Sequence, residues 1–510
     1  MLFNSIEFIF LFLPITLLSY LLTSRLFYSS WAISCVAASL FFYGWWNPKY
    51  LSLLIFSILF NYCVGFFLSK NSIVPIIRKN LLFLGIAVNL GLIGYFKYTN
   101  FFLENLNAII NTNFSHPQII LPLGISFFTF QQIAYLVDSY RGETKEYNLL
   151  YYSLFVSFFP QLIAGPIVHH KDIIPQFTNK SIARFSSENI AVGLAFFLLG
   201  LFKKVLLADS IVAGAANQTF SAATAGSELS FLDAWVGTLA YTFQLYFDFS
   251  GYSDMAIGAA RIFGIRLPIN FNSPYKAVSI SDFWRRWHIT LSNFLRDYLY
   301  IPLGGSRKGE LRRNLNLIIT MLLGGLWHGA GWTFVVWGGL HGVYLVLNHQ
   351  WRSLRKFLGH NLQQSFWWSQ ILGYVVTFLA VVVAWVFFRA ESMDASFNIL
   401  GAMSGKNGVS LSLNVLSDKG FTFIGKLILL GFVIWCLPNT NQLVANYFKF
   451  KGNYVSEKHK SNNNRNIFHR LKSYLWHPGI IGGILLGLGL FIVVKMMIKV
   501  PESEFLYFNF

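Results

Sequence analysis

The 36 residues from position 314 to position 349 include no Asp, Glu, Lys or Arg. An apolar stretch of this length spans a bilayer, and a titratable group inside a bilayer is costly enough to be a candidate for function. Two histidines, His328 and His341, lie well inside the stretch. These two side chains are therefore the first candidates for a functional site.

Composition assigns the chain to the polytopic membrane proteins. Of its 510 residues, 55% are hydrophobic, 18% aromatic and only 12% charged, which excludes a soluble domain of this size. The net charge of +18 is typical of cytoplasmic loops in a membrane protein, and no nucleic-acid-binding motif accompanies it. The three cysteines have no metal-ligand spacing, so no metal site is predicted.

Apolar runs of spanning length recur along the chain and predict roughly ten to twelve membrane spans in an all-α bundle. A further apolar segment, residues 119–137, is interrupted by Pro122 and Gly124, and we expect a broken or re-entrant element there. The predicted spans lie near residues 6–22, 32–46, 50–68, 81–96, 149–168, 190–207, 231–262, 315–347, 371–388, 423–437 and 480–497.

The distribution of lysine and arginine in short loops predicts the orientation. The N-terminus is expected outside, because basic residues collect after the first and third spans. The basic stretches 266–313, 352–356 and 449–472 are expected inside, the last with a polar linker at 461–464. The nearly neutral loop 389–419 is expected outside.

Residues 314–349 therefore begin and end on the same face of the membrane. A straight helix of this length would measure about 54 Å, nearly twice the roughly 30 Å hydrocarbon core. We predict a hairpin of two arms with its bend near Gly329, Ala330 and Gly331. His328 would then lie near the apex, deep in the membrane.

The segment 281–300, SDFWRRWHITLSNFLRDYLY, is predicted to form one amphipathic helix at the membrane boundary. Trp284, Trp287 and Leu291 recur there at helical spacing, and Ser281 is a candidate N-cap. His288 either points at lipid headgroups from an interfacial anchor or contributes to a site with His328. Periodicity alone does not separate these two interpretations.

Residues 324–342, GGLWHGAGWTFVVWGGLHG, combine glycines, tryptophans and both histidines. Glycines let helix backbones approach closely and leave room beside a histidine for a substrate. A neutral imidazole can take a proton from a hydroxyl near pH 7 without a standing buried charge. His328 is therefore predicted to act in chemistry, with an interhelical hydrogen bond as the structural alternative. Asp248, also in an apolar context, could orient an imidazole or pair with an arginine.

WRRWHITLSNFLRDYLYIPLGG, followed by LLGGLWHGAGWTFVVWGGLHG, resembles the signature of the membrane-bound O-acyltransferase (MBOAT) family, in particular its bacterial alginate O-acetyltransferase branch. The stretches FFPQLIAGPIVHH and YFDFSGYSDMAIG extend the resemblance to most of the chain. The D-alanylating branch that serves teichoic acids has similar motifs in shorter chains. We expect a single domain over residues 1–510, with the signature at about 120–350 and C-terminal spans at 368–498.

The resemblance implies a helical bundle with re-entrant or interfacial helices and a tunnel through the membrane. In it, His328 would be the essential catalytic residue and His288 would line the same passage. Acetyl groups would come from cytoplasmic acetyl-CoA, a donor substrate rather than a bound cofactor. They would reach an extracytoplasmic polysaccharide through a periplasmic or membrane-anchored acetyltransferase partner, at the bacterial inner membrane.

Thioester chemistry suits these residues, because an acyl thioester is already activated and needs only a base, a dry passage and a way to hold an anionic donor. A transporter or channel with a histidine proton relay is the alternative, although no inverted repeat is visible. The acceptor stays open among alginate, another exopolysaccharide, cellulose and peptidoglycan, and His328 could be acylated or act only as a base. The predicted substrate-binding residues are Arg285, Arg286, Arg307, Lys308, Arg312, Arg313, His341 and Trp327.

Overall fold

The computed structural model describes residues 1–25, 29–70, 72–144, 148–179, 182, 185–362, 366–410, 413, 415–416, 420–444, 479–499 and 503–509. Within these ranges the chain forms helices and no strand, which confirms the prediction of an all-α fold. The predicted linker 461–464 and the basic loop 449–472 lie outside the described residues.

The helices form two compact units that alternate along the chain. The first comprises Met1–Leu201, Tyr252–Ile269 and Thr440–Glu504, and the second comprises Phe202–Gly251, Asn270–Asn439 and Phe505–Phe510. Helix α12 (Phe231–Ile262) contributes residues to both units. The single domain over residues 1–510 stays a prediction.

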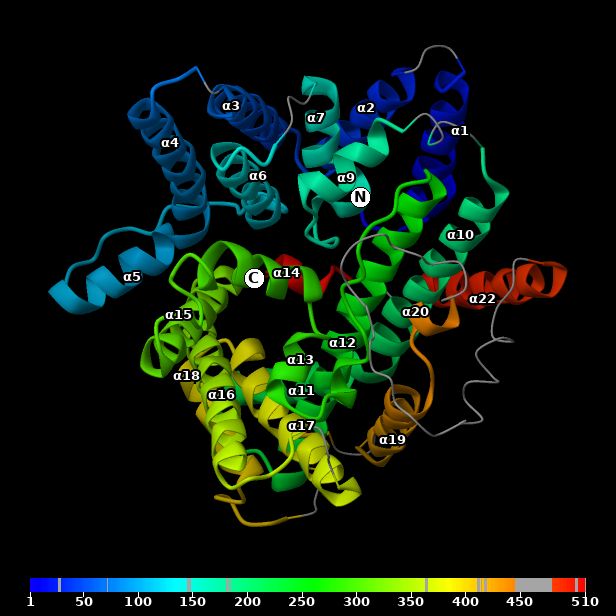
Figure 1. Cartoon of the computed structure of the whole chain (residues 1–510). Helices are drawn as coiled ribbons and strands as arrows, with labels where there is room; N and C mark the ends of the chain where they lie inside the picture. The colour runs from blue at the N-terminus through cyan, green and yellow to red at the C-terminus, as the bar shows by residue number, and fades with distance from the viewer. Residues whose placement is uncertain are drawn as a thin grey trace. The chain divides into compact units, whose positions relative to one another are not determined.

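In the first unit, α3 (Leu51–Ser69), α4 (Pro75–Ile93) and α6 (Ile125–Tyr140) pack against one another (Figure 1). Helix α6 begins directly after Gly124, whose φ of 71° is left-handed, so the helix starts at the expected interruption. The other helices that begin in this unit are α1 (Leu13–Thr23), α2 (Ser30–Trp46), α5 (Thr99–Ile110), α7 (Leu149–Ser157), α8 (Phe159–Leu162), α9 (His170–Phe177), α10 (Ser187–Phe202), α20 (Thr440–Leu443) and α22 (Ile480–Lys499).

In the second unit, one long helix, α16, packs against four others, α13, α15, α17 and α18. Helix α12, which contributes to both units, has the bounds that were predicted, and its residues 240–262 are all buried, including the polar side chains of Asp248, Asp254 and Arg261. The other helices of this unit are α11 (Ala213–Thr224), α13 (Ile280–Trp284), α14 (Ile289–Leu295), α15 (Glu310–His328), α16 (Trp332–Phe357), α17 (Trp367–Arg389), α18 (Met393–Met403), α19 (Gly420–Cys436) and the short 3₁₀ turn η9 (Leu506–Asn509).

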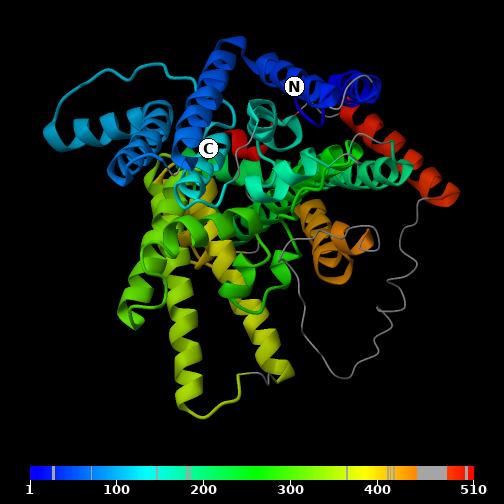
Figure 2. The ribbon, with the colours of Figure 1, turned by 45° about the horizontal axis from the view of Figure 1, so that its top comes forward.

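The predicted hairpin is confirmed. Helix α15 ends at His328, α16 begins at Trp332, and Gly329 and Gly331 between them are extended, with φ of −158° and −170°. Figure 2 shows α15 and α16 side by side. The bend therefore follows directly after the histidine that the sequence placed near the apex.

Two glycines bring the arms of the hairpin into backbone contact. A Cβ on Gly325 would lie 2.3 Å from the Phe334 carbonyl oxygen, and one on Gly338 would lie 2.3 Å from the Met321 carbonyl oxygen. Such distances are shorter than any real Cβ contact, so only glycine fits at these two positions.

By length and apolar composition, fewer helices in the described ranges could cross a bilayer than the roughly ten to twelve spans predicted. Five helical segments are long and apolar enough to cross a bilayer, and other apolar runs form shorter or more polar helices. The continuous span expected at residues 149–168 is wrong, because the chain there breaks into α7 and α8, and Pro160 stands at the start of α8. The five segments are Pro48–Ser69, Pro75–Ile110, Ser187–Thr224, Trp367–Arg389 and Ile480–Lys499.

Candidate functional site

His328, the last residue of α15, lies in a cage of aromatic rings. The side chain is 4% exposed. Its ring centroid is 4.8 Å from that of Trp327, 4.9 Å from that of Trp337 and 5.2 Å from that of Phe388, each in an edge-to-face arrangement. Such contacts are specific in geometry, so the cage holds the imidazole in one place away from bulk water.

His288 interrupts the segment that was predicted to be one helix. Helix α13 ends at residue 284 and α14 begins at residue 289. Between them His288 has φ 40° and ψ 54°, the left-handed conformation that an L-residue does not continue as a helix. The prediction of an unbroken helix over residues 281–300 is therefore wrong, and so is the cap, because Ser279 rather than Ser281 accepts a hydrogen bond from the Asp282 N–H.

The interfacial-anchor interpretation is also wrong. Trp284 and Trp287 are buried inside the protein, and His288 is fully buried. The tryptophans that recur at helical spacing thus form protein core, and the histidine does not face lipid headgroups.

A hydrogen bond from His288 to Asn270 fixes the tautomer of this histidine. Nδ1 of His288 lies 3.1 Å from Oδ1 of Asn270, and the same oxygen accepts from the Thr290 N–H at 3.3 Å and the Thr290 hydroxyl at 3.0 Å. A backbone N–H can only donate, so the amide presents its oxygen here. Nδ1 therefore carries the proton, and Nε2 of the neutral ring has the lone pair that can accept one.

Burial keeps this ring neutral. Loss of hydration of the charged form lowers the pKa of His288 to about 3. Near pH 7 the side chain is consequently an uncharged imidazole, the form that a general base requires.

His341 lies on α16, one aromatic ring away from His328. It is fully buried, with ring centroids 4.8 Å from Trp337 and 5.2 Å from Trp284. Within the described part of the chain, neither ring nitrogen of His341 nor the indole N–H of Trp284 or Trp337 has a hydrogen-bond partner. Buried polar atoms without partners are rare and costly, so these nitrogen atoms could bind a polar group of a substrate.

Two tryptophans join the three histidines into one cluster. The ring centroid of Trp327 lies 6.2 Å from that of His288 and 4.8 Å from that of His328. The ring centroid of Trp337 lies 4.9 Å from that of His328 and 4.8 Å from that of His341. The structure therefore brings together four of the predicted site residues, His288, Trp327, His328 and His341. Their catalytic and binding roles stay predictions.

The six predicted basic residues lie at the start of α15 and beside α13, and their surroundings differ. Arg286 Nε donates to the Asp282 carboxylate at 3.0 Å, and an Arg313 guanidinium nitrogen donates to Glu310 at 2.7 Å. Arg313 also lies within electrostatic range of His349 near the end of α16, together with Arg285 and Arg352. Basic charge thus gathers at the open end of the hairpin, and four of the six side chains are exposed: Arg285, Arg307, Lys308 and Arg312.

Sequence analysis did not identify two residues that contact His288. Asn270 lies 18 residues before His288, and the ring of Phe249 on α12 meets the imidazole edge-to-face at 4.8 Å. Only folding brings these segments together. Asp248, for which an imidazole or an arginine was expected as partner, pairs instead with Lys204, with Nζ 2.5 Å from Oδ1.

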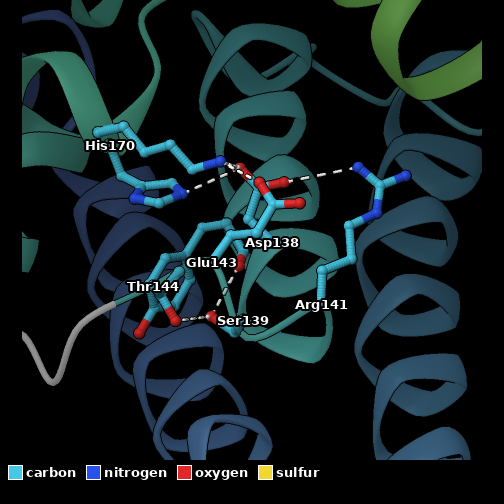
Figure 3. A network of polar contacts seen from close by, with 8 residues as sticks. Asp138, Ser139, Arg141, Glu143, Thr144 and His170 are labelled. Carbon is cyan, nitrogen blue, oxygen red and sulfur yellow. Dashed lines mark hydrogen bonds and ion pairs between the residues drawn. The ribbon is translucent and has the colours of Figure 1, made fainter.

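A different histidine, His170, belongs to a polar network of the first unit (Figure 3). Its Nε2 lies 3.0 Å from the Asp138 carboxylate, and both side chains are buried. Lys171 and Arg141 each lie 3.8 Å from the same carboxylate, and Lys171 also pairs with Glu143. The network ties the C-terminal end of α6 to the first turn of α9.

Comparison with known proteins shows the family. A model described as the membrane-bound O-acyltransferase family matches residues 138–390. The peptidoglycan O-acetyltransferase of Helicobacter pylori is 44% identical over 100% of this chain and 98% of its own length. This chain belongs to the membrane-bound O-acyltransferase family.

Other members of the membrane-bound O-acyltransferase family match less of the chain. A probable alginate O-acetylase, AlgI, of Azotobacter vinelandii is 43% identical over 79% of this chain and 78% of its own length. The teichoic acid D-alanyltransferase of Streptococcus thermophilus is 27% identical over 54% of this chain and 70% of its own length. The protein is thus a multi-pass membrane O-acyltransferase, and the alternative of a transporter or channel is wrong.

Proposed function

We propose that this enzyme transfers acetyl groups from cytoplasmic acetyl-CoA to a polysaccharide outside the membrane, with peptidoglycan as the first acceptor to test. Peptidoglycan is put before alginate because the relative named for peptidoglycan matches the full length of the chain, whereas the relatives named for alginate match about four fifths of it. The observation that carries the chemistry is the buried cluster in which Trp327 joins His288 to His328.

In the proposed reaction His328 acts as the base, aided by His288. The imidazole takes the proton of an acceptor hydroxyl while the hydroxyl oxygen bonds to the thioester carbonyl carbon. The carbon–sulfur bond then breaks, and the proton passes from the imidazole to the departing thiolate of coenzyme A. His341 and the Trp337 indole, whose nitrogen atoms lack hydrogen-bond partners within the described ranges, would bind the acyl carbonyl oxygen, on which negative charge develops.

The donor would enter at the open end of the hairpin. Coenzyme A carries phosphates, and exposed arginines and lysines bind phosphate through charge-assisted hydrogen bonds. Arg285, Arg307, Lys308 and Arg312 are available for this role, whereas Arg286 and Arg313 already have carboxylate partners. No bound cofactor or metal enters the proposed reaction.

The proposal also implies an orientation, with the N-terminus outside a bacterial inner membrane and the exposed residues Arg307, Lys308 and Arg312 at the cytoplasmic face. His288, in the same basic stretch, lies deeper, beside Trp327 near the bend of the hairpin. Single cysteines at Ser306 and Ser353 should then react with an impermeant thiol reagent only from the cytoplasmic face, and one at Ser410 only from outside. Labelling of Ser306 and Ser353 from opposite faces would contradict this orientation. The acceptor hydroxyl in the proposed reaction belongs to the polysaccharide itself or to a periplasmic or membrane-anchored acetyltransferase partner, which would then pass the acetyl group to the polymer.

The decisive experiment uses purified protein in liposomes, with radiolabelled acetyl-CoA outside and a muropeptide or alginate oligomer inside. Release of free coenzyme A with appearance of acetyl ester in the acceptor compartment is expected for the wild type and not for His328→Gln. If acetyl-CoA is consumed only when a candidate partner protein is added, the partner is part of the reaction. If labelled acetyl-CoA is never cleaved, the donor is wrong.

A further inference from the structure

The C-terminal turn packs against Phe249, an aromatic residue that contacts His288. Phe505 is 1% exposed, and its ring centroid is 5.3 Å from that of Phe249 on α12. Phe249 in turn meets His288 edge-to-face at 4.8 Å, with an angle of 88° between the ring planes. The C-terminal turn (residues 505–509) is therefore one aromatic ring away from a predicted catalytic imidazole.

A buried group of charges anchors this turn. The N–H of Leu506 donates to Oδ2 of Asp248 at 3.2 Å, and the other carboxylate oxygen accepts from Lys204 at 2.5 Å. Lys204 also pairs with Asp209 at 3.1 Å, so one ammonium group serves two carboxylates. The backbone N–H of Leu506 gives Asp248 a further donor, which a buried carboxylate needs because it has lost its hydration.

The residues that form the hydrogen bond are adjacent in sequence to the residues whose rings are in contact, both on α12 and in the C-terminal turn. Asp248 precedes Phe249 on α12, and Phe505 precedes Leu506 in the C-terminal turn. The hydrogen bond at one residue therefore sets the register in which the two aromatic rings at the neighbouring residues meet. His288 is consequently fixed from two directions, by Asn270 at Nδ1 and by Phe249 at its ring.

We propose that the C-terminal turn is a positioning element of the acyl-transfer site, with Phe505 and the Asp248–Leu506 hydrogen bond holding Phe249 against His288. None of these residues touches the reacting atoms. They act through the place and orientation of the imidazole, where a misplacement of about 1 Å can cost on the order of a hundredfold in rate. The inference rests on the proposed function for its effect on catalysis, but not for its effect on His288 itself.

The test pairs two disruptive variants with two conservative ones in the full-length protein. Leu506→Pro removes the N–H donor at the first position of a 3₁₀ turn, where proline is tolerated, and Leu506→Ala keeps the N–H. Phe505→Ala removes the ring that backs Phe249, and Phe505→Leu keeps an apolar side chain of similar bulk. Each variant is assayed for kcat and KM with acetyl-CoA and for modification of individual histidines by diethyl pyrocarbonate, read by mass spectrometry.

We expect Leu506→Pro and Phe505→Ala to lower kcat by about tenfold or more, with the KM for acetyl-CoA within about twofold of the wild-type value. His288 should become reactive in both, while His341 stays protected. Leu506→Ala and Phe505→Leu should retain most of the activity and the protection.

Two results would overturn the inference. One is wild-type kcat and wild-type protection of His288 in both disruptive variants. The other is joint exposure of His288 and His341 with a lowered melting temperature, which would mean that the turn only stabilises the fold. If the wild type itself fails to cleave acetyl-CoA, the proposed function fails, and the protection of His288 still decides whether the turn positions it.

Discussion

His170 and His328 are both buried histidines, but their surroundings differ in kind. His170 lies 3.0 Å from the carboxylate of Asp138, inside a network that includes Lys171 and Arg141. His328 is held by three aromatic rings at 4.8 to 5.2 Å. A carboxylate partner occupies one ring nitrogen, whereas aromatic rings restrain the imidazole through its faces and edges.

His170 is thus expected to stabilise the fold, whereas His328 is expected to take part in the reaction. A buried carboxylate–histidine pair gains from staying together, and it ties two helix ends to each other. The imidazole of His328 is held by edge-to-face contacts with three aromatic rings, and its proposed role is to exchange a proton. We therefore expect substitutions at the two positions to affect different quantities.

The largest effect is expected at His328. His328→Ala and His328→Gln should lower acetyl transfer by about a hundredfold to ten-thousandfold, the contribution of a general base, because neither side chain can accept and release the proton. The melting temperature and the amount of protein in the membrane should stay near wild type. Activity near wild type in His328→Gln would contradict the proposal that His328 acts as acid and base, and would leave no functional difference between His328 and His170.

Asp138→Ala should instead destabilise the protein. Removing one partner of a buried pair costs about 3 kcal/mol in the free energy of unfolding, while kcat per folded molecule should be unchanged. Glu143→Ala is the matched control, because Glu143 belongs to the same network but is about half exposed, and its loss should cost about 0.5 kcal/mol or less. Thermal unfolding in detergent measures both. Loss of kcat without loss of stability would place Asp138 in the chemistry.

His288 differs from both His170 and His328, because we expect its burial to make the stability of the protein depend on pH. The folded pKa of about 3 is below the usual value of about 6.5, so the unfolded chain binds a proton first as the pH falls. The contribution of neutral His288 to stability is therefore complete above about pH 6.5 and is lost toward pH 3, by about 1 kcal/mol per pH unit.

The variant His288→Asn removes the titrating imidazole and so isolates its contribution to the pH dependence of stability. Asparagine tolerates the left-handed conformation, and its amide can still donate to Asn270. The wild type should lose stability faster than the variant when thermal unfolding is compared between pH 6.5 and pH 4.5. Parallel pH profiles would show that the ring is hydrated in the native protein.

The smallest effect is expected at the exposed basic side chains. Neutralising Arg307, Lys308 and Arg312 to glutamine should raise the KM for acetyl-CoA several-fold and leave kcat within about twofold, with a difference that shrinks at high salt. Lys79→Gln, an exposed lysine on α4 of the first unit, controls for the general loss of positive charge. Unchanged donor kinetics in the triple variant would mean that these charges serve membrane topology alone.

The hairpin and the buried helix α12 could be predicted from the sequence because each depends on local information. A charge-free run too long for one crossing must bend, and the glycines mark where. The break at His288 could not be predicted, because the left-handed conformation is stabilised by Asn270 from a preceding segment. Asp138 and His170 are 32 residues apart and meet only in the folded protein, where α7 packs against both α6 and α9. The doublet His169–His170 therefore carries no sign of its carboxylate partner.

The backbone contact between α15 and α16 has a consequence for motion. Where two helices meet through glycines, no side chains can change rotamer to let one helix slide or tilt, so the two arms move together. Access for a substrate must come from another wall of the cage, and Phe388 on α17 provides one that belongs to a different helix.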